Sequence, residues 1–349
     1  MGGRKLKVAS VATALVMTGA FAAVAAARTH GSAAPAKAAA KYRIGLVLPD
    51  LSNLYIAGIR DGAQAQAKKS GVDLLVKGTN DAAGQTNATL AYVGAKVNAI
   101  VVDAIDGKAI IPAVKAANKA NIPVVAIQSN VYGGKTATFI AGREDLAGKY
   151  IGQDAVNWCK KYNPCKIGIV EGIRADQSGA TENKAFRAVV GKVPSIKIVG
   201  ASETQYDPAK ALNLASNFLT ANPDLNYIYA WWDPGAAAAV KAIQAAGKLG
   251  KVGVGAQNGD CIALGLVIKG HQTQTSAFFP SIIGSQGVIS AVSAVQGKTL
   301  PKYIEAPVLS VTTKLANAWL AGTSQPPAKL RADIMRRLKE AKSGNCPTK

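Results

Sequence analysis

The side chains in this sequence that are best suited to chemistry are aromatic rings, amides and carboxylates. Trp231 and Trp232 are adjacent, and Asp233 follows them directly. Flat rings stack on the apolar C–H faces of a sugar or on another planar ring, while amides and carboxylates bind hydroxyl groups. These residues predict binding of a small ring compound, although each ring could equally belong to the core. Side chains alternate along a strand, so we expect one indole to face a ligand and the other to point away.

Catalytic patterns are sparse. The chain has only two histidines, His30 and His271. Few residues could therefore serve as the base of a Ser-His-Asp or Cys-His catalytic arrangement. Asp103 and Asp106 could do acid–base work, but acids that follow strands often only cap the next helix. We therefore expect a binding protein and not an enzyme.

The sequence also lacks the motifs that bind nucleotides and zinc. Val292 occupies the position where a phosphate loop ending in Gly297-Lys298-Thr299 would need glycine, and Gly253-x-Gly255 continues to Asn258. The sequence has no Cys-x-x-Cys pair of the kind that binds zinc. We expect no cofactor and no metal.

Residues 1–27 have the three parts of a secretory signal peptide. A basic start is followed by an apolar run over 8–27, and Ala25 and Ala27 fit an Ala-x-Ala cleavage site. A retained membrane anchor is the alternative, although Ala-rich segments partition weakly into lipid. Residues 28–41 are rich in Ala, Ser, Gly, Pro and Lys and predict a flexible leader. We expect export to the periplasm or the cell exterior, without lipid attachment because the first cysteine is Cys159.

Four cysteines in an exported chain are expected to pair. Cys159 and Cys165 bracket a five-residue turn that could bring their Cα atoms within bridging range. Cys261 and Cys346 would then tie the C-terminal tail to the body. Four unpaired thiols are the alternative.

The formal charge of the 349-residue chain is +21, from 41 basic and 20 acidic residues. The first 40 residues carry five bases and no acid, which leaves +16 on the rest. A basic body suits nucleic acid and an anionic cell envelope equally well. In the tail, residues 324–349 hold seven bases and two acids. That balance predicts a basic solvated helix, or alternatively a contact site for a partner or membrane.

The body consists of strand–helix units. Short apolar runs predict strands at 43–48, 73–76, 99–102 and 124–127, and helical spacing predicts a helix after each of the first three. The same order resumes after residue 141, with strands at 167–170, 196–199, 227–230 and 252–255 and helices at 146–160, 181–190, 209–220 and 235–246. Short buried strands that alternate with helices are typical of α/β proteins with doubly wound parallel sheets. The length suits two such lobes.

Ligands of open parallel sheets bind beyond the carboxyl ends of the strands. In the first half these ends are residues 49–55, 103–106 and 128–130. In the second half they are residues 171–177, 204–206, 231–233 and 257–260. We expect the site among them.

Several motifs resemble the ribose-type periplasmic sugar-binding proteins. The matching segments are 44–55 (IGLVLPDLSNLY), 61–64 (DGAQ), 116–125 (AANKANIPVV), 219–224 (LTANPD) and 245–247 (AAG). They occur in the family's order over about 42–312. The resemblance implies a type I periplasmic binding protein fold, in which two lobes joined by three crossovers enclose a ligand.

By that comparison, one lobe is 42–141 plus 280–306 and the other is 142–279 plus 307–315. Residues 316–349 form a basic C-terminal extension. The hinges fall near 141–143, 279–280 and 306–308.

The resemblance also implies ligand-binding residues, and here the sequence departs from the ribose group. Asp103 stands where that group has asparagine, Gln128-Ser129 replaces an Asp-Arg pair, and Ala180 aligns with a second arginine. Trp232 replaces the asparagine before Asp233. The full set implied by the alignment is Asn53, Tyr55, Asp103, Gln128, Tyr206, Trp232, Asp233, Gln257 (for an aspartate) and Phe278 (for a hinge glutamine).

Most of the charged residues with which the ribose group binds a small pentose are thus replaced here. A modified sugar, a polyol, a nucleoside or a similar ring compound fits better than plain ribose. The resemblance implies a monomer that serves an ABC importer with its permease and ATPase. A sensory receptor that presents its ligand to a membrane chemoreceptor or kinase is the alternative. A lac-repressor-type regulator would need a helix-turn-helix where the apolar run stands, so we expect no nucleic acid partner.

Overall fold

The fold is described here from a computed structural model for residues 42–174 and 176–347. The predicted signal peptide and the predicted leader lie outside these residues. Within them, no helix is long and apolar enough to cross a bilayer.

Continuous apolar runs form the first sheet. In β1 the last five residues are all buried, as expected for a strand covered by helices on both faces. The strand order is β11-β5-β4-β3-β1-β2, and every neighbouring pair is parallel. The strands are β1 (Tyr42–Leu48), β2 (Val72–Gly78), β3 (Ala99–Val102), β4 (Val124–Ile127), β5 (Thr138–Gly142) and β11 (Tyr303–Ala306).

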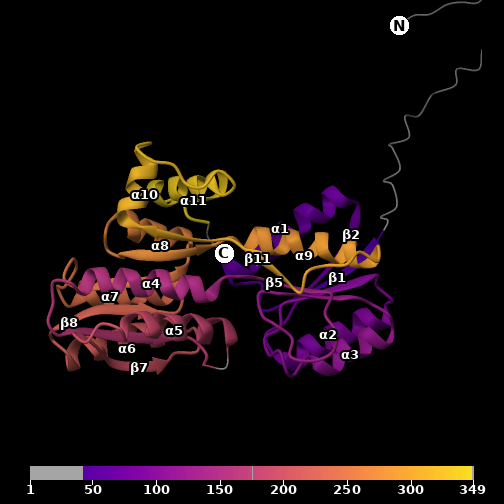
Figure 1. Cartoon of the computed structure of the whole chain (residues 1–349), viewed down its shortest axis with the longest axis horizontal. Coiled ribbons are helices and arrows are strands. Elements are labelled where there is room, and N and C mark those ends of the chain that lie inside the picture. Colours follow the sequence, from indigo (N-terminus) through magenta and orange to yellow (C-terminus); the bar gives the residue numbers. More distant parts are fainter. Residues whose placement is uncertain (1–41, 175, 348–349) are drawn as a thin grey trace, which may run out of the picture. The chain divides into compact units, whose positions relative to one another are not determined.

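Two pairs of helices cover this sheet. One core cluster packs α1 (Leu54–Ser70) and α9 (Pro280–Val295) against one face. A second packs α2 (Ala82–Gly94) and α3 (Ile111–Lys119) against the other, and Figure 1 shows the two layers on opposite sides of the strands. Asn53 caps α1 by accepting from two backbone N–H groups, and Gly71 ends it in the left-handed conformation.

The second sheet repeats the plan in the order β12-β10-β9-β8-β6-β7, with only β12 antiparallel. Its strands are β6 (Cys165–Glu171), β7 (Ile196–Glu203), β8 (Leu225–Ala230), β9 (Gly253–Asn258), β10 (Gln274–Phe278) and β12 (Val308–Thr312). Its helices are α4 (Glu144–Cys159), α5 (Gln177–Val190), α6 (Pro208–Ala221), α7 (Asp233–Ala245) and α8 (Cys261–Ile268). Two successive doubly wound α/β units were predicted, and this fold class is confirmed.

The chain passes between the two sheets three times. It leaves the first after β5, returns to it after β10 with α9, and leaves again between β11 and β12. At the first two passages Phe278 packs against Gly142, where an added Cβ would lie 2.2 Å from the ring. This contact joins two crossovers that are far apart in sequence.

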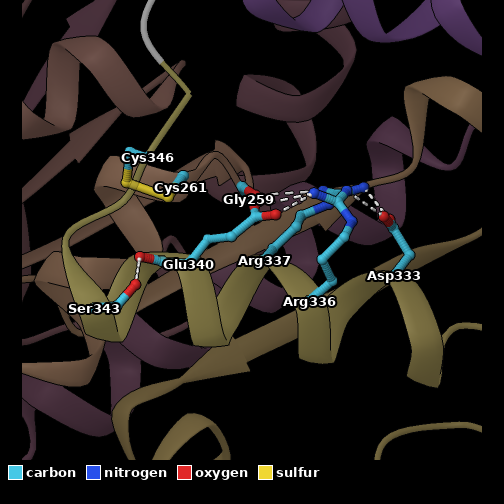
Figure 2. Close-up of polar contacts among 8 residues, drawn as sticks. All are labelled: Gly259, Cys261, Asp333, Arg336, Arg337, Glu340, Ser343 and Cys346. Carbon is cyan, nitrogen blue, oxygen red and sulfur yellow. Dashed lines mark hydrogen bonds and ion pairs between the residues drawn. A yellow bond between two sulfur atoms is a disulfide. The ribbon is translucent and has the colours of Figure 1, made fainter.

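The C-terminal region forms α10 (Thr313–Leu320) and α11 (Arg331–Ser343). A helix was predicted here, but its description as simply solvated was wrong, because Ile334, Leu338 and Ala341 are buried in a cluster with α8. The basic residues occupy the remaining faces of an amphipathic helix. Figure 2 shows Arg337 reaching from α11 to the carbonyl oxygen of Gly259, 3.3 Å from its Nη1.

Both predicted disulfides are present. Cys159 and Cys165 close the turn after α4 with Cα atoms 5.5 Å apart. Cys261 at the start of α8 bonds Cys346 just beyond α11, which fastens the tail to the body (Figure 2).

Candidate functional site

A cleft of about 330 Å³ lies between residues of the two sheets. One wall comes from the loop after β4 and from β5, and the other from the starts of α4 and α5. Its principal polar lining residues are Gln128, Ser129, Asn130, Tyr132, Arg143, Glu144, Asp145, Gln177, Ser178, Thr181 and Tyr303. Of the nine predicted ligand-binding residues, Gln128 alone lines this cleft.

Gln128 connects both walls. The hydroxyl of Tyr55 donates to its Oε1 over 2.9 Å. Its Nε2 donates to Glu144 Oε1 at 3.2 Å and lies 3.5 Å from Ser178 Oγ. The predicted pair Tyr55 and Gln128 is therefore brought together, and it faces polar groups from the starts of α4 and α5.

Glu144 is the most unusual group in the cleft. It is only 8% exposed, and its Oε2 has no hydrogen-bond partner. Burial raises the pKa of its carboxyl to about 8, with a further rise from the charge of Asp176, against the lowering effect of hydrogen bonds from Ser178 and Gln128. Near neutral pH it can hold a proton or release it.

A second buried carboxyl, Asp103, lies at the end of β3. Burial raises its pKa to about 7, partly offset by hydrogen bonds from Ser129 and increased by the charge of Asp176. Asp103 is 2% exposed. Asp176 thus influences both of these carboxyl groups.

Asp176 also anchors an aromatic group in the second lobe. It caps α5 by accepting from the backbone N–H of Ser178, and it also accepts from the hydroxyl of Tyr206. The Tyr206 ring meets Trp232 edge to face, with centroids 5.3 Å apart. The predicted residues Tyr206 and Trp232 are therefore in contact.

Both indoles are buried, and the expectation that one of them faces a ligand stays a prediction. Trp231 is 1% exposed and Trp232 is 7% exposed, and neither lines the cleft. An added Cβ at Gly179 would lie 2.3 Å from the Trp231 ring, which shows how closely this ring packs on α5. Its Nε1 is buried without a hydrogen-bond partner.

Most of the other predicted residues make hydrogen bonds or packing contacts within the protein. Asp233 is fully buried and accepts from Thr275 Oγ1 at 2.8 Å and from the backbone N–H of Asp260 at 2.9 Å. Asn53 caps α1, and Phe278 packs at the crossover. Gln257 is 7% exposed, with its Oε1 unpartnered.

No pattern in the sequence pointed to Glu144, Ser178 or Tyr132 as site residues. Glu144 follows the first crossover and begins α4, where an acid is ordinarily explained by the helix dipole. Its position directly after the predicted hinge at 141–143 was the available signal. In the described part of the chain, no group of three or more His, Cys, Asp or Glu side chains is placed to hold a metal ion.

Two α/β lobes with a polar cleft between them are the architecture of a solute-binding protein. Residues 44–299 match the family described as periplasmic binding protein domain. The chain belongs to this family.

The relatives agree with the ribose-type resemblance. The ribose import binding protein RbsB of Escherichia coli (strain K12) is 30% identical over 272 residues, which cover 77% of this chain and 90% of that protein. The corresponding protein of Bacillus subtilis (strain 168) is 26% identical over 78% of this chain and 88% of its own length. These relatives are binding proteins, which confirms that an enzyme is not the correct class.

A solved structure shares most of this fold. The periplasmic solute-binding protein of an ABC transporter from Actinobacillus succinogenes 130z, with bound D-allose, has 26% identity and a TM-score of 0.75. The match covers 79% of this chain and 99% of that one. The type I periplasmic binding protein fold is thereby confirmed.

Proposed function

We propose that this chain is the extracytoplasmic solute-binding component of an ABC importer. It takes a sugar-like ring solute between its lobes and delivers it, unchanged, to a permease whose ATPase partner supplies the energy. The observation that carries this proposal is the cleft lined from both sheets, in which Gln128 Nε2 donates to Glu144 Oε1 over 3.2 Å. The ribose-type relatives support the solute class.

The proposed lobes are residues 42–141 plus 280–306 and residues 142–279 plus 307–315, with 316–349 as an extension. The membership of the strands supports these boundaries, since β5 and β11 belong to the first sheet and β10 and β12 to the second. Ligand that touches both lobes would stabilise the closed arrangement over the open one.

The proposed binding residues remain the nine that the resemblance implied, with Glu144 and Ser178 added from the cleft. Tyr55 and Gln128 are the best supported, because they bond each other beside the second lobe. Asp233, with its oxygens satisfied inside the lobe, would act by holding the loop that begins α8.

Export through the segment 1–27 belongs to the same proposal and is supported by its sequence pattern and by the periplasmic relatives. The disulfides also suit an oxidising compartment.

The test is a calorimetric titration of the full chain with sugars, polyols and nucleosides, followed by reconstitution with the permease and ATPase. An importer component binds a solute, and the loaded protein accelerates ATP hydrolysis. Binding without that acceleration would favour the sensory receptor. Chemical turnover of the solute would contradict the proposal.

A further inference from the structure

The cleft contains an acidic side chain without a counter-ion. Glu144 is buried, faces the cleft and has one oxygen without a hydrogen-bond partner. A carboxylate taken out of water is costly unless a cation or several donors accompany it. Gln128 donates to its other oxygen, and hydrogen bonding from Ser178 also lowers the pKa of this carboxyl.

The adjacent cation does not compensate this charge. Arg143 donates to both oxygens of Asp145, at 2.6 and 2.7 Å, and its Nη1 lies 3.6 Å from Glu305. One guanidinium is thus shared between two other acids. None of the ion pairs among the described residues includes Glu144, Asp103 or Asp176.

Further acidic residues lie around Glu144. Asp176 raises the pKa of both Glu144 and Asp103, and Glu144 in turn raises the pKa of the buried Glu182. The titratable and charged groups that act on Glu144 or feel its charge are Tyr55, Asp145, Asp176, Glu182, Tyr206, Tyr229 and Tyr303. Acidic groups therefore gather around Glu144 in a protein whose overall charge is +21, and their raised pKa values mean that a bound cation would favour the ionised forms.

Aromatic rings accompany these acids. Tyr55 reaches the same Gln128 that bonds Glu144, and Tyr132 and Tyr303 line the cleft. Tyrosine faces attract cations as well as the C–H faces of sugars. A metal ion would need grouped ligands, which the described residues do not offer.

We propose that the solute is a ring compound bearing a protonated amine, of the amino-sugar class, whose ammonium group pairs with Glu144. This inference rests on the proposed function and specifies its ligand. The ammonium would supply both the positive charge and the hydrogen-bond donor that Glu144 Oε2 lacks. Ser178 and Gln128 would bind the neighbouring hydroxyl groups.

Matched pairs of probes test this proposal. D-Glucosamine, D-galactosamine and D-mannosamine are each titrated into the protein by calorimetry, and so are D-glucose, D-galactose and D-mannose. Each amino sugar differs from its parent sugar only in that an amine replaces one hydroxyl group. The full chain is used with two variants, Glu144→Gln and Asp154→Asn. Asp154 is the matched control because it is a half-buried acid on the same helix, whose carboxylate accepts from the hydroxyls of Tyr227 and Thr273 outside the cleft.

The proposal expects at least one amino sugar to bind the unaltered chain ten-fold or more tightly than its parent sugar. Glu144→Gln should remove that preference, and Asp154→Asn should keep it. Tighter binding of the parents, or an amine preference that survives Glu144→Gln, would overturn the inference. Parents that bind while amino sugars do not would leave the proposed function standing, whereas no binding by any of the six probes would count against both.

Discussion

The hydroxyl of Tyr132 donates to Gln177 Oε1 over 2.9 Å, and so joins the loop after β4 to the first residue of α5. One residue belongs to the proposed first lobe and the other to the second. Both line the cleft. A direct bond across the cleft is an interaction that closure can make and opening must break.

Tyr132→Phe is expected to weaken solute binding without changing the fold. A hydrogen bond of this kind contributes about 0.5–1.5 kcal/mol, so the dissociation constant should rise by roughly 2- to 10-fold. Calorimetric titration measures the change. Tyr162→Phe is the control, because the Tyr162 hydroxyl bonds the Lys251 carbonyl within one lobe. Equal effects of both changes would contradict a role for Tyr132 in closure.

Gly142→Ala should disturb the crossover between the lobes. Its new Cβ would lie 2.2 Å from the Phe278 ring, so that the ring or the backbone must move. Overpacking of this kind costs about 1–3 kcal/mol, measurable as a lower midpoint of urea unfolding. Gly94→Ala, also a glycine at the end of a regular element, has open space around it and should be neutral or slightly stabilising. Unchanged stability in Gly142→Ala would show that the contact is loose.

The stability of the ligand-free protein should fall as the pH rises from 5 to 8. Burial raises the folded-state pKa of Glu144 from 4.5 to about 8 and that of Asp103 from 3.8 to about 7. The folded state therefore binds more protons than the unfolded state in this range, and the stability present at low pH is lost as these groups ionise.

Glu144→Gln is expected to remove part of that slope, on the order of 1–3 kcal/mol between pH 5 and 8. Thermal unfolding at a series of pH values gives the slope for both proteins. The parallel substitution Asp106→Asn is the control, because Asp106 is exposed and hydrogen bonds from Ala109 and Lys108 lower its pKa. An unaltered slope in Glu144→Gln would mean that Glu144 stays ionised throughout.

The two disulfides should differ in their effect on stability. Cys261–Cys346 spans 85 residues and Cys159–Cys165 spans 6, so the first restricts the unfolded chain more. Chain-entropy arithmetic gives about 4–5 kcal/mol for the longer loop and about 2 kcal/mol for the shorter. Paired Cys→Ala variants and urea unfolding test the order. A larger loss for Cys159–Cys165 would contradict it.

Much of the fold could be predicted from the sequence, because buried parallel strands are continuous apolar runs. The run at residues 99–102 coincides with β3, and 124–127 coincides with β4. Strands β5 and β10 were not predicted, and they carry more polar residues such as Thr138, Gln274 and Ser276. They lie next to the crossovers, where strand position depends on contacts between distant segments.

The site was harder to predict because it, too, depends on contacts between segments that are distant in sequence. The resemblance located Tyr55 and Gln128, which the structure brings together, because sheet topology places strand ends at a common edge. Glu144 and Asp176 begin helices, where acids are commonplace caps or dipole partners. The burial of Glu144 and the effect of the Asp176 charge on it depend on the packing of α4 and α5, which no local spacing encodes.

The most direct test of enclosure between the lobes is a crystal structure of the full chain with the tightest-binding probe. Our account predicts that a single solute molecule contacts Gln128 from one lobe and Glu144 or Ser178 from the other. A solute bound to one lobe alone, or outside this cleft, would contradict it.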